Sequence, residues 1–316
     1  MNLFAIPTLV LSLIMVSRGA GWLTGSICHI SARKGLSIGA LGMALGGLIT
    51  TLPELTVSTM ASALRDVELS VANAIGSTIF NVLGIVGICG LIRPLRFDRT
   101  FLRDSARNAL LVYLAFYVIA LVGNSIGMVD SLALFMIIIL SLFYTHQRGS
   151  AENPRSDPVP GTPARDIGEV LVGGAVLGIG SYLLIRAATS LASDLGVPQL
   201  AIGLSLVAVG TSIPELATGL ASTKRGIEEV SIGNVLGANI YDVTLVLGCS
   251  ALVSTLLHDT SLPVGGPLLF FSIPAMIGAT AFLMIAGRHG TISRTTSGFM
   301  LTAYIAYVVV NFLGVL

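Results

Sequence analysis

The sequence predicts an all-α polytopic membrane protein: ten transmembrane helices in two inverted repeats of five, with proline-broken second and seventh helices. Three observations predict this fold: an apolar composition, one polar connector at mid-chain, and two motifs that recur in each half at a constant spacing. Hydrophobic residues fill 54% of the 316 positions and charged residues only 10%, with a mean hydropathy of +0.91. Water-soluble domains carry about 25% charged residues, so this chain has too few polar residues to cover a soluble body.

Charge and cysteine content exclude several other classes of protein. The net charge is +1 and there is no tract of Lys or Arg, which argues against a nucleic-acid partner. The three cysteines, Cys28, Cys89 and Cys249, lie far apart without a CxxC pair, so they predict neither a disulfide framework nor a zinc site. No basic residue precedes the first apolar run, which indicates a transmembrane helix at the N-terminus and not a signal peptide.

Ten apolar segments are long enough to cross a bilayer, because a transmembrane helix needs about 20 mainly apolar residues. They lie near 3–26, 37–64, 69–92, 106–123, 127–145, 168–192, 199–222, 229–256, 264–286 and 295–314. The stretch 146–167 is rich in Pro, Ser, Gly and charge, which is typical of a flexible connector. The chain therefore divides into a first five-helix repeat at 1–145 and a second at 168–316.

The basic residues predict the orientation, since cytoplasmic loops carry an excess of Lys and Arg. If the N-terminus is outside, the cytoplasmic loops hold 14 of the 17 basic residues: Arg33, Lys34, Arg93, Arg96, Arg99, Arg103, Arg107, Arg148, Arg155, Arg165, Lys224, Arg225, Arg288 and Arg294. We therefore expect a multi-pass protein of the plasma membrane, with both termini outside and the connector in the cytoplasm. We also expect it to function as a monomer.

Two pairs of segments show that the halves repeat each other. LGMALGGLITTLPEL at 41–55 aligns with IGLSLVAVGTSIPEL at 202–216, and ANAIGSTIFNVLGI at 72–85 aligns with GNVLGANIYDVTLV at 233–246. Both alignments have the same offset and need no gap, and chance matches between apolar segments would not keep this register. Because each half has an odd number of helices, the second half must enter the membrane from the opposite side.

Three carboxylates fall inside apolar segments: Glu54, Glu215 and Asp242. A carboxylate at bilayer depth costs several kcal/mol unless it is paired, protonated or coordinated, so it indicates a functional site. The helices that carry these residues offer no basic residue at a matching depth. We therefore expect a bound cation or a proton to supply the missing positive charge.

Each glutamate follows a proline, at Pro53 and Pro214. A proline inside a helix has no N–H to donate and its ring crowds the carbonyl four residues earlier. The sequence thus predicts helix breaks near Ile49 and Gly210, where freed carbonyl oxygens need a polar partner. A metal ion or water would suit them.

The third and eighth predicted helices add a polar face. Residues at i, i+4 and i+8 lie along one side of a helix, and this spacing joins Asn73, Ser77 and Asn81, with the repeat partners Asn234, Ala238 and Asp242. The polar set holds carboxylates, amides and hydroxyls but neither thiols nor imidazoles. All-oxygen ligation suits Ca²⁺, Na⁺ or Mg²⁺ and disfavours zinc or copper. Two or three negative charges suit one divalent ion or several monovalent ions.

These motifs resemble the α-1 and α-2 repeats of the sodium/calcium exchangers, in the cation/Ca²⁺ antiporter superfamily. The second half carries GTSIPE at 210–215 and GNVLGANIYD at 233–242, close to the signature of that family. The resemblance spans the whole chain. It implies a transporter and not an enzyme, with alternating access, Ca²⁺ exported against Na⁺ entry, and no cofactor besides the transported ions.

The resemblance also implies a set of metal ligands: Glu54, Glu215, Thr50, Thr51, Ser77, Asn81, Thr211, Ser212 and Asp242, with main-chain oxygens of Gly47 and Ala208. Glu54 and Glu215 would bind Ca²⁺ and also contact Na⁺. Three positions depart from the family pattern: Ile49 and Ala72 replace glycines, and Ala238 stands where a serine hydroxyl would help to bind Na⁺. The departures leave the Na⁺ stoichiometry open.

Other functions compete with this interpretation. The nearest is a H⁺- or K⁺-coupled Ca²⁺/cation exchanger of the same superfamily. Asp242, which is the repeat counterpart of Asn81, is the residue that leaves K⁺ open as the coupled ion. An intramembrane enzyme could use two carboxylates as acid and base, but no Ser/His pair or zinc-ligand spacing accompanies them. A channel would more often gain its symmetry by oligomerisation, whereas broken helices in inverted repeats are typical of a carrier.

Overall fold

The computed structural model describes residues 5–34, 37–148, 162–194 and 208–312, and helices make up most of them. The helices and helical segments of the first half are α1 (Ala5–Lys34), α2 (Ile38–Leu41), η1 (Gly42–Gly46), α3 (Gly47–Thr50), α4 (Leu52–Ala63), α5 (Val67–Ile79), η2 (Phe80–Ile85), α6 (Val86–Ile92), α7 (Arg99–Gly123) and α8 (Met128–Arg148). Those of the second half are α9 (Pro163–Asp194), α11 (Ala208–Thr211), α12 (Ile213–Arg225), α13 (Glu228–Tyr241), η4 (Asp242–Val246), α14 (Leu247–His258), η5 (Leu268–Ser272), α15 (Ile273–Ala286) and α16 (Arg294–Phe312). The η segments are π-helical.

Six of the described helices are long and apolar enough to cross a membrane: Val10–Lys34, Val67–Ile92, Arg99–Gly123, Met128–Gln147, Glu228–His258 and Leu268–Ala286. The bent pair Ile38–Thr50 and Leu52–Ala63 makes a seventh span if it is counted as one. The chain is therefore a helical membrane protein. The predicted spans 168–192, 199–222 and 295–314 do not appear among these, and part of 199–222 lies outside the described residues. That the chain has ten transmembrane helices, and that its two halves are inverted repeats, both stay predictions.

Both helices that contain a Pro-Glu pair are broken, as predicted, but the breaks lie two residues later than the sequence suggested. The first falls at Thr51, where the axis bends by 41°, and the second at Ser212. The reason lies in the hydrogen bonding. Thr51 N still donates to Gly47 O at 3.0 Å and Ser212 N to Ala208 O at 3.4 Å, so each helix continues until then. The proline then enters the first turn of the next helix, where its missing N–H is not needed.

Four short strands link the ends of the bundle, which the all-α prediction did not include. β1 (Leu95–Arg96) pairs antiparallel with β4 (Thr291–Ile292), and Leu95 lies opposite Ile292. β2 (Ser125–Ile126) pairs in the same way with β3 (Leu262–Pro263). Each pair joins a loop of the first half to a loop of the second. A two-residue strand carries no periodicity from which a sequence could predict it.

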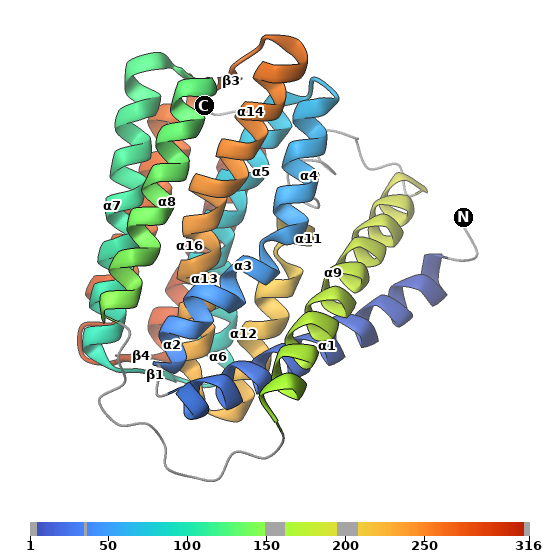
Figure 1. Cartoon of the computed structure of the whole chain (residues 1–316), viewed down its shortest axis with the longest axis vertical. Helices are drawn as coiled ribbons and strands as arrows, with labels where there is room; N and C mark the ends of the chain where they lie inside the picture. Colours follow the sequence, from blue (N-terminus) through green and yellow to red (C-terminus); the bar gives the residue numbers. More distant parts are fainter. Residues whose placement is uncertain (1–4, 35–36, 149–161, 195–207, 313–316) are drawn as a thin grey trace.

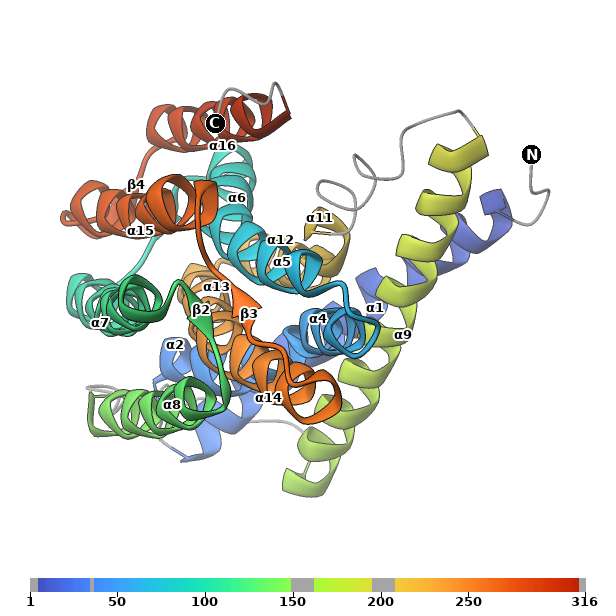
Figure 2. The ribbon, with the colours of Figure 1, turned by 90° about the horizontal axis from the view of Figure 1, so that it is seen from above.

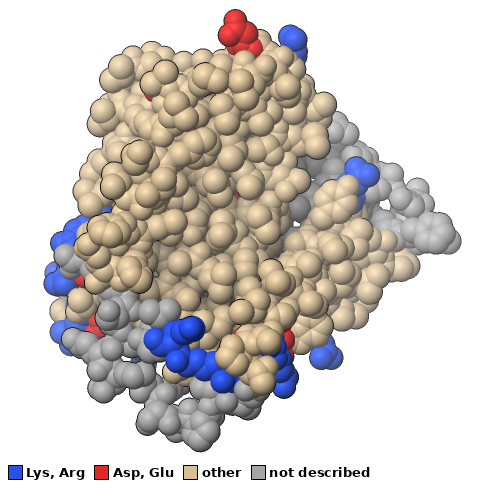
Figure 3. All heavy atoms as spheres, in the orientation of Figure 1, with Lys and Arg blue, Asp and Glu red and all other residues tan. Residues whose placement is uncertain are grey.

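Figures 1 and 2 show how the helices are arranged. α1 and α9 lie side by side at one edge, while α7, α8, α15 and α16 form the opposite edge. α13 runs through the middle, and every residue of it except Glu229 is buried. α1 and α9 approach closely at Gly19, where an added Cβ would stand only 2.7 Å from Gly173 O. Figure 3 shows mainly uncharged flanks, with Lys and Arg gathered at the lower end.

Candidate ion-binding site

The two buried glutamates occupy matching places beside the helix breaks. Glu54 lies in the first turn of α4 and Glu215 in the first turn of α12. Their side chains are almost completely buried, at 1% and 0% exposure. The first turn of a helix has free N–H groups and a partial positive charge, which favour an anion there. Each break therefore places a carboxylate where the backbone partly compensates its charge.

Among the six side-chain oxygens of Glu54, Glu215 and Asp242, only one has a hydrogen-bond partner. Ser212 Oγ donates to Glu54 Oε1 at 3.1 Å. Glu54 Oε2, both oxygens of Glu215 and both oxygens of Asp242 have no hydrogen-bond partner. Among the described residues, no Lys, Arg or His forms an ion pair with them. If these carboxylates are ionised, their buried negative charge needs a cation.

Two hydrogen bonds of equal length connect the broken helices to the polar helices of the other half. Thr50 Oγ1 donates to Asn234 Oδ1 at 3.2 Å, and Thr211 Oγ1 donates to Asn73 Oδ1 at 3.2 Å. In the sequence repeat Thr211 is the counterpart of Thr50, and Asn234 is the counterpart of Asn73. The structure thus brings together the four polar segments that the sequence singled out.

The main-chain oxygens of Gly47 and Ala208 also lie beside this cluster. Gly47 O accepts hydrogen bonds from Thr51 Oγ1 at 2.7 Å and from Thr50 Oγ1 at 3.3 Å. Ala208 O accepts from Thr211 Oγ1 at 3.2 Å and Ser77 Oγ at 3.3 Å. A hydroxyl can rotate its proton elsewhere and present its oxygen to an ion. These hydroxyls and carbonyls therefore form two groups of neutral oxygens, one at each break.

Asn81 is held so that one acceptor is free. Its Nδ2 donates to Asn239 Oδ1 at 2.9 Å, and Asn239 Nδ2 donates to Thr78 O at 3.0 Å. Asn81 Oδ1 is buried without a partner, which is the amide atom that an oxygen-ligated cation would use. Asn81 lies in η2, and Asp242 is the first residue of η4. Single π-helical turns inside α-helices are frequent at functional sites.

The predicted ligand set left out three amides that the structure places in the cluster: Asn73, Asn234 and Asn239. The spacing of the polar face already pointed to the first two, and GNVLGANIYD contains the third. Their surroundings differ. Asn73 Nδ2 donates to Ser58 Oγ at 3.0 Å, whereas Asn234 Nδ2 has no partner because the counterpart of Ser58 in the second repeat is Gly219.

Close backbone contact holds the first broken helix against α13 (Figure 1). A Cβ at Gly47 would stand 2.7 Å from Ala238 N, and one at Gly237 would stand 2.1 Å from Met43 O. Only glycine permits such an approach. Ile49, which replaces a glycine of the family signature, packs against Gly174 of α9, where a Cβ would lie 2.6 Å from Ile49 Cγ2.

Two observations limit the ligands that this cluster offers to a cation. No group of three or more His, Cys, Asp or Glu side chains among the described residues is placed to hold a metal ion. Any cation here must therefore combine fewer carboxylates with neutral oxygens. Ala238 is fully buried against the first broken helix and, as the sequence indicated, contributes no hydroxyl.

Comparison with known proteins decides the family. The family model described as "Sodium/calcium exchanger protein" matches residues 4–146 and 167–313, which is most of the chain. The chain belongs to the sodium/calcium exchanger family. The two matched segments leave out only the predicted connector and the extreme ends.

Similar proteins agree with this membership in the family. The sodium/calcium exchanger MaX1 of Methanosarcina acetivorans is 27% identical over 346 aligned positions, covering 96% of this chain and 97% of its own. The inner membrane protein YrbG of Escherichia coli is 29% identical and covers 80% of this chain and 81% of its own. A solved structure of the sodium-calcium exchanger NCX_Mj, soaked with Na⁺ and Sr²⁺, matches with a TM-score of 0.85 at 26% identity, over 98% of this chain and 99% of that one.

A sodium/calcium exchanger family member is a membrane transport protein, so this chain is a transporter and the expected ion and calcium transport is confirmed at the level of the family. The residues that bind ions in this chain, and the ions that it couples, stay predictions.

Proposed function

We propose that this protein is a secondary active antiporter that exchanges Na⁺ for Ca²⁺ across the membrane by alternating access. One observation carries the proposal: five of the six oxygens of Glu54, Glu215 and Asp242 are buried without hydrogen-bond partners. Ionised carboxylates in a low-dielectric interior are stable only beside positive charge. A transported cation supplies that charge and leaves again, which a fixed basic residue does not.

The proposed ligands are all oxygens. They comprise the carboxylates of Glu54, Glu215 and Asp242, the hydroxyls of Thr50, Thr51, Ser77, Thr211 and Ser212, the amide oxygen of Asn81 and the main-chain oxygens of Gly47 and Ala208. Ca²⁺ takes six to eight oxygen ligands in flexible geometry, and a mixture of one or two carboxylates with neutral oxygens suits it. Na⁺ would use the same oxygens in turn, so that occupancy by one ion excludes the other.

We further propose that residues 1–145 and 168–316 form two inverted five-helix repeats, ten spans in all, joined by the connector at 146–167. The equal bonds Thr50–Asn234 and Thr211–Asn73 support a two-fold relation between the halves. Inverted repeats with broken helices at their interface are the architecture of carriers that alternate between two open states. We place both termini outside, the connector in the cytoplasm and the monomer in the plasma membrane, on the distribution of basic residues.

The test is uptake of radiolabelled Ca²⁺ into proteoliposomes loaded with Na⁺. An outward Na⁺ gradient should drive Ca²⁺ accumulation, and an equal concentration of Na⁺ on both sides should not. Uptake that ignores the Na⁺ gradient would overturn Na⁺ coupling. Glu68→Gln, an exposed carboxylate of α5, is the matched control for the site variants.

The same assay separates the H⁺- and K⁺-coupled alternatives. H⁺ coupling predicts accumulation driven by a pH gradient without Na⁺. K⁺ coupling predicts that uptake requires K⁺, outside the vesicles if K⁺ moves with Ca²⁺ and inside them if it moves with Na⁺. The human sodium/potassium/calcium exchanger 4 is 25% identical to this chain, but over only 111 residues, which cover 34% of this chain and 18% of that exchanger. That short match does not favour K⁺ coupling over the Na⁺/Ca²⁺ exchange proposed here.

A further inference from the structure

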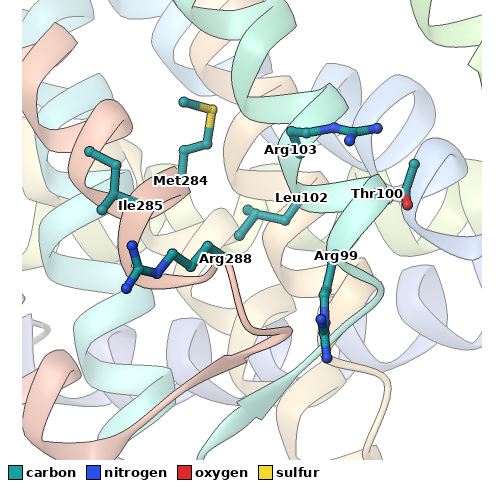
Figure 4. A pocket seen from close by; sticks show the side chains of 7 residues that line it. All are labelled: Arg99, Thr100, Leu102, Arg103, Met284, Ile285 and Arg288. Atoms are coloured by element: carbon teal, nitrogen blue, oxygen red, sulfur yellow. The ribbon is translucent and has the colours of Figure 1, made fainter.

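A second polar site lies far from the helix breaks, at the end of the bundle where α7 begins and α15 ends. A cavity of about 410 Å³ opens there between the two helices. Figure 4 shows its side chains: Arg99 and Arg103 come from α7 and Arg288 follows α15, while Leu102, Met284 and Ile285 supply apolar walls. Three arginines thus line one cavity beside apolar side chains, and their guanidinium groups point in different directions (Figure 4).

The positive charge of this cavity is largely uncompensated. Arg103 is the exception, because its Nε pairs with the buried Asp104 at 3.2 Å from Oδ1. Among the described residues, no carboxylate lies within ion-pair distance of Arg99 or Arg288. The Arg288 Nε–H donates to His289 Nε2 at 3.0 Å. This hydrogen bond uses one of the five N–H donors of the Arg288 guanidinium and leaves four for an anion. Two arginines without an ion-pair partner, Arg99 and Arg288, attract an anion, and guanidinium groups bind phosphate with paired hydrogen bonds.

The apolar walls indicate what kind of anion this is. Ile285 is 58% exposed on the flank of α15, whereas Leu102 is 1% exposed and forms the floor. Both α7 and α15 belong to segments that qualify as membrane spans, so their ends lie near the membrane surface. The cavity is also far larger than one inorganic phosphate needs. A molecule with a phosphate at the surface and a hydrocarbon chain along the flank would use both halves of it.

We propose that this cavity binds the headgroup of an anionic glycerophospholipid, whose phosphate contacts Arg99 and Arg288 and whose acyl chain follows Met284 and Ile285. Basic pockets between transmembrane helices bind anionic lipid headgroups elsewhere. The bound lipid joins α7 of the first half to α15 of the second and so stabilises their contact. This proposal does not depend on which ions the protein exchanges.

The experiment measures the thermal unfolding of the full-length protein in detergent, with phosphatidylglycerol, phosphatidylcholine or inorganic phosphate added. We expect phosphatidylglycerol to raise the Tm of the wild type and phosphatidylcholine to raise it much less. The double variant Arg99→Gln/Arg288→Gln should lose at least about tenfold in apparent affinity for phosphatidylglycerol, because both charge-assisted contacts to the phosphate are removed. Arg96→Gln, an exposed arginine of β1 outside the cavity, should keep the wild-type response.

Two results would overturn the proposal. An unchanged response of the double variant to phosphatidylglycerol would show that the lipid binds elsewhere. Equal stabilisation by inorganic phosphate at the same concentration would show a site for a free anion instead of a lipid. If the double variant does not fold, the single variant Arg288→Gln, at an exposed position after α15, carries the same comparison.

Discussion

Ser212 Oγ donates a hydrogen bond to Glu54 Oε1 at 3.1 Å, across 158 positions of the sequence. The corresponding pair in the other direction, Thr51 and Glu215, makes no such bond. Thr51 Oγ1 donates to Gly47 O of its own helix instead, and both oxygens of Glu215 remain without partners. The two glutamates are therefore unequal: a hydrogen bond from the opposite helix holds Glu54, and no such hydrogen bond holds Glu215.

This hydrogen bond predicts a specific cost for removing the Ser212 hydroxyl. Ser212→Ala removes a hydrogen bond to a charged group, worth about 1.5–3 kcal/mol, so half-maximal Ca²⁺ uptake should need about tenfold more Ca²⁺ or above. Thr51→Ser keeps a hydroxyl beside Gly47 O and should stay within about threefold of the wild type on the same scale. Ser222→Ala is the control, because Ser222 Oγ donates to Thr218 O within α12. Equal affinities in all three variants would contradict a positioning role for Ser212.

Replacement of either glutamate by glutamine should abolish Na⁺-driven Ca²⁺ uptake while the protein still folds. The change keeps the shape of the side chain and removes the charge that a divalent ion needs. Ligand binding stabilises the folded state by about 2.7 kcal/mol when the ligand is a hundredfold above its Kd. Ca²⁺ should therefore raise the Tm of the wild type and of Glu68→Gln, but not that of Glu54→Gln or Glu215→Gln. Retained uptake in both site variants would remove the two residues from the proposed site.

Much of this site follows from the sequence, for physical reasons. The constant offset between the two repeats pairs Thr50 with Thr211 and Asn73 with Asn234, and the cross-contacts that these four residues make are equal in length. The break positions were missed by two residues because Pro53 and Pro214 need no N–H in the first turn of a new helix. A proline in the first turn of the second helix therefore allows the first helix to continue until shortly before that proline.

Other features depend on how helices meet in space. The fixed orientation of the Asn81 amide comes from Asn239, 158 residues away, and nothing within either helix sets it. The orphaned Asn234 Nδ2 arises because Gly219 stands where the other half has Ser58. A sequence alignment shows that difference, but only the structure shows that Ser58 Oγ is the partner of Asn73 Nδ2.

The contact between α13 and the first broken helix predicts a sharp cost for a single methyl group. A Cβ at Gly237 would stand 2.1 Å from Met43 O, and a backbone carbonyl cannot move aside as a side-chain tip can. Gly237→Ala should lower the free energy of unfolding by about 1–3 kcal/mol, as overpacking does, and should reduce transport. Gly278→Ala in α15 is the control: no atom lies within 4 Å of its added Cβ, so it should be neutral or stabilising by about 1 kcal/mol. Thermal unfolding in detergent compares the two, and equal Tm values would contradict the close contact.

Asp242 predicts how transport responds to acid. Its side chain is 1% exposed and neither oxygen has a hydrogen-bond partner. If a transported cation binds this carboxylate, protons compete with the cation for the same oxygens, so acid should inhibit uptake. Asp242→Asn cannot take up that proton, and Asn is the residue that the other half carries at the equivalent position, Asn81. We expect Ca²⁺ uptake by Asp242→Asn to fall less steeply than that of the wild type as the pH is lowered from mildly alkaline to mildly acidic, with Glu68→Gln following the wild type. Superimposable pH profiles for the wild type and Asp242→Asn would show that Asp242 keeps one protonation state throughout the cycle.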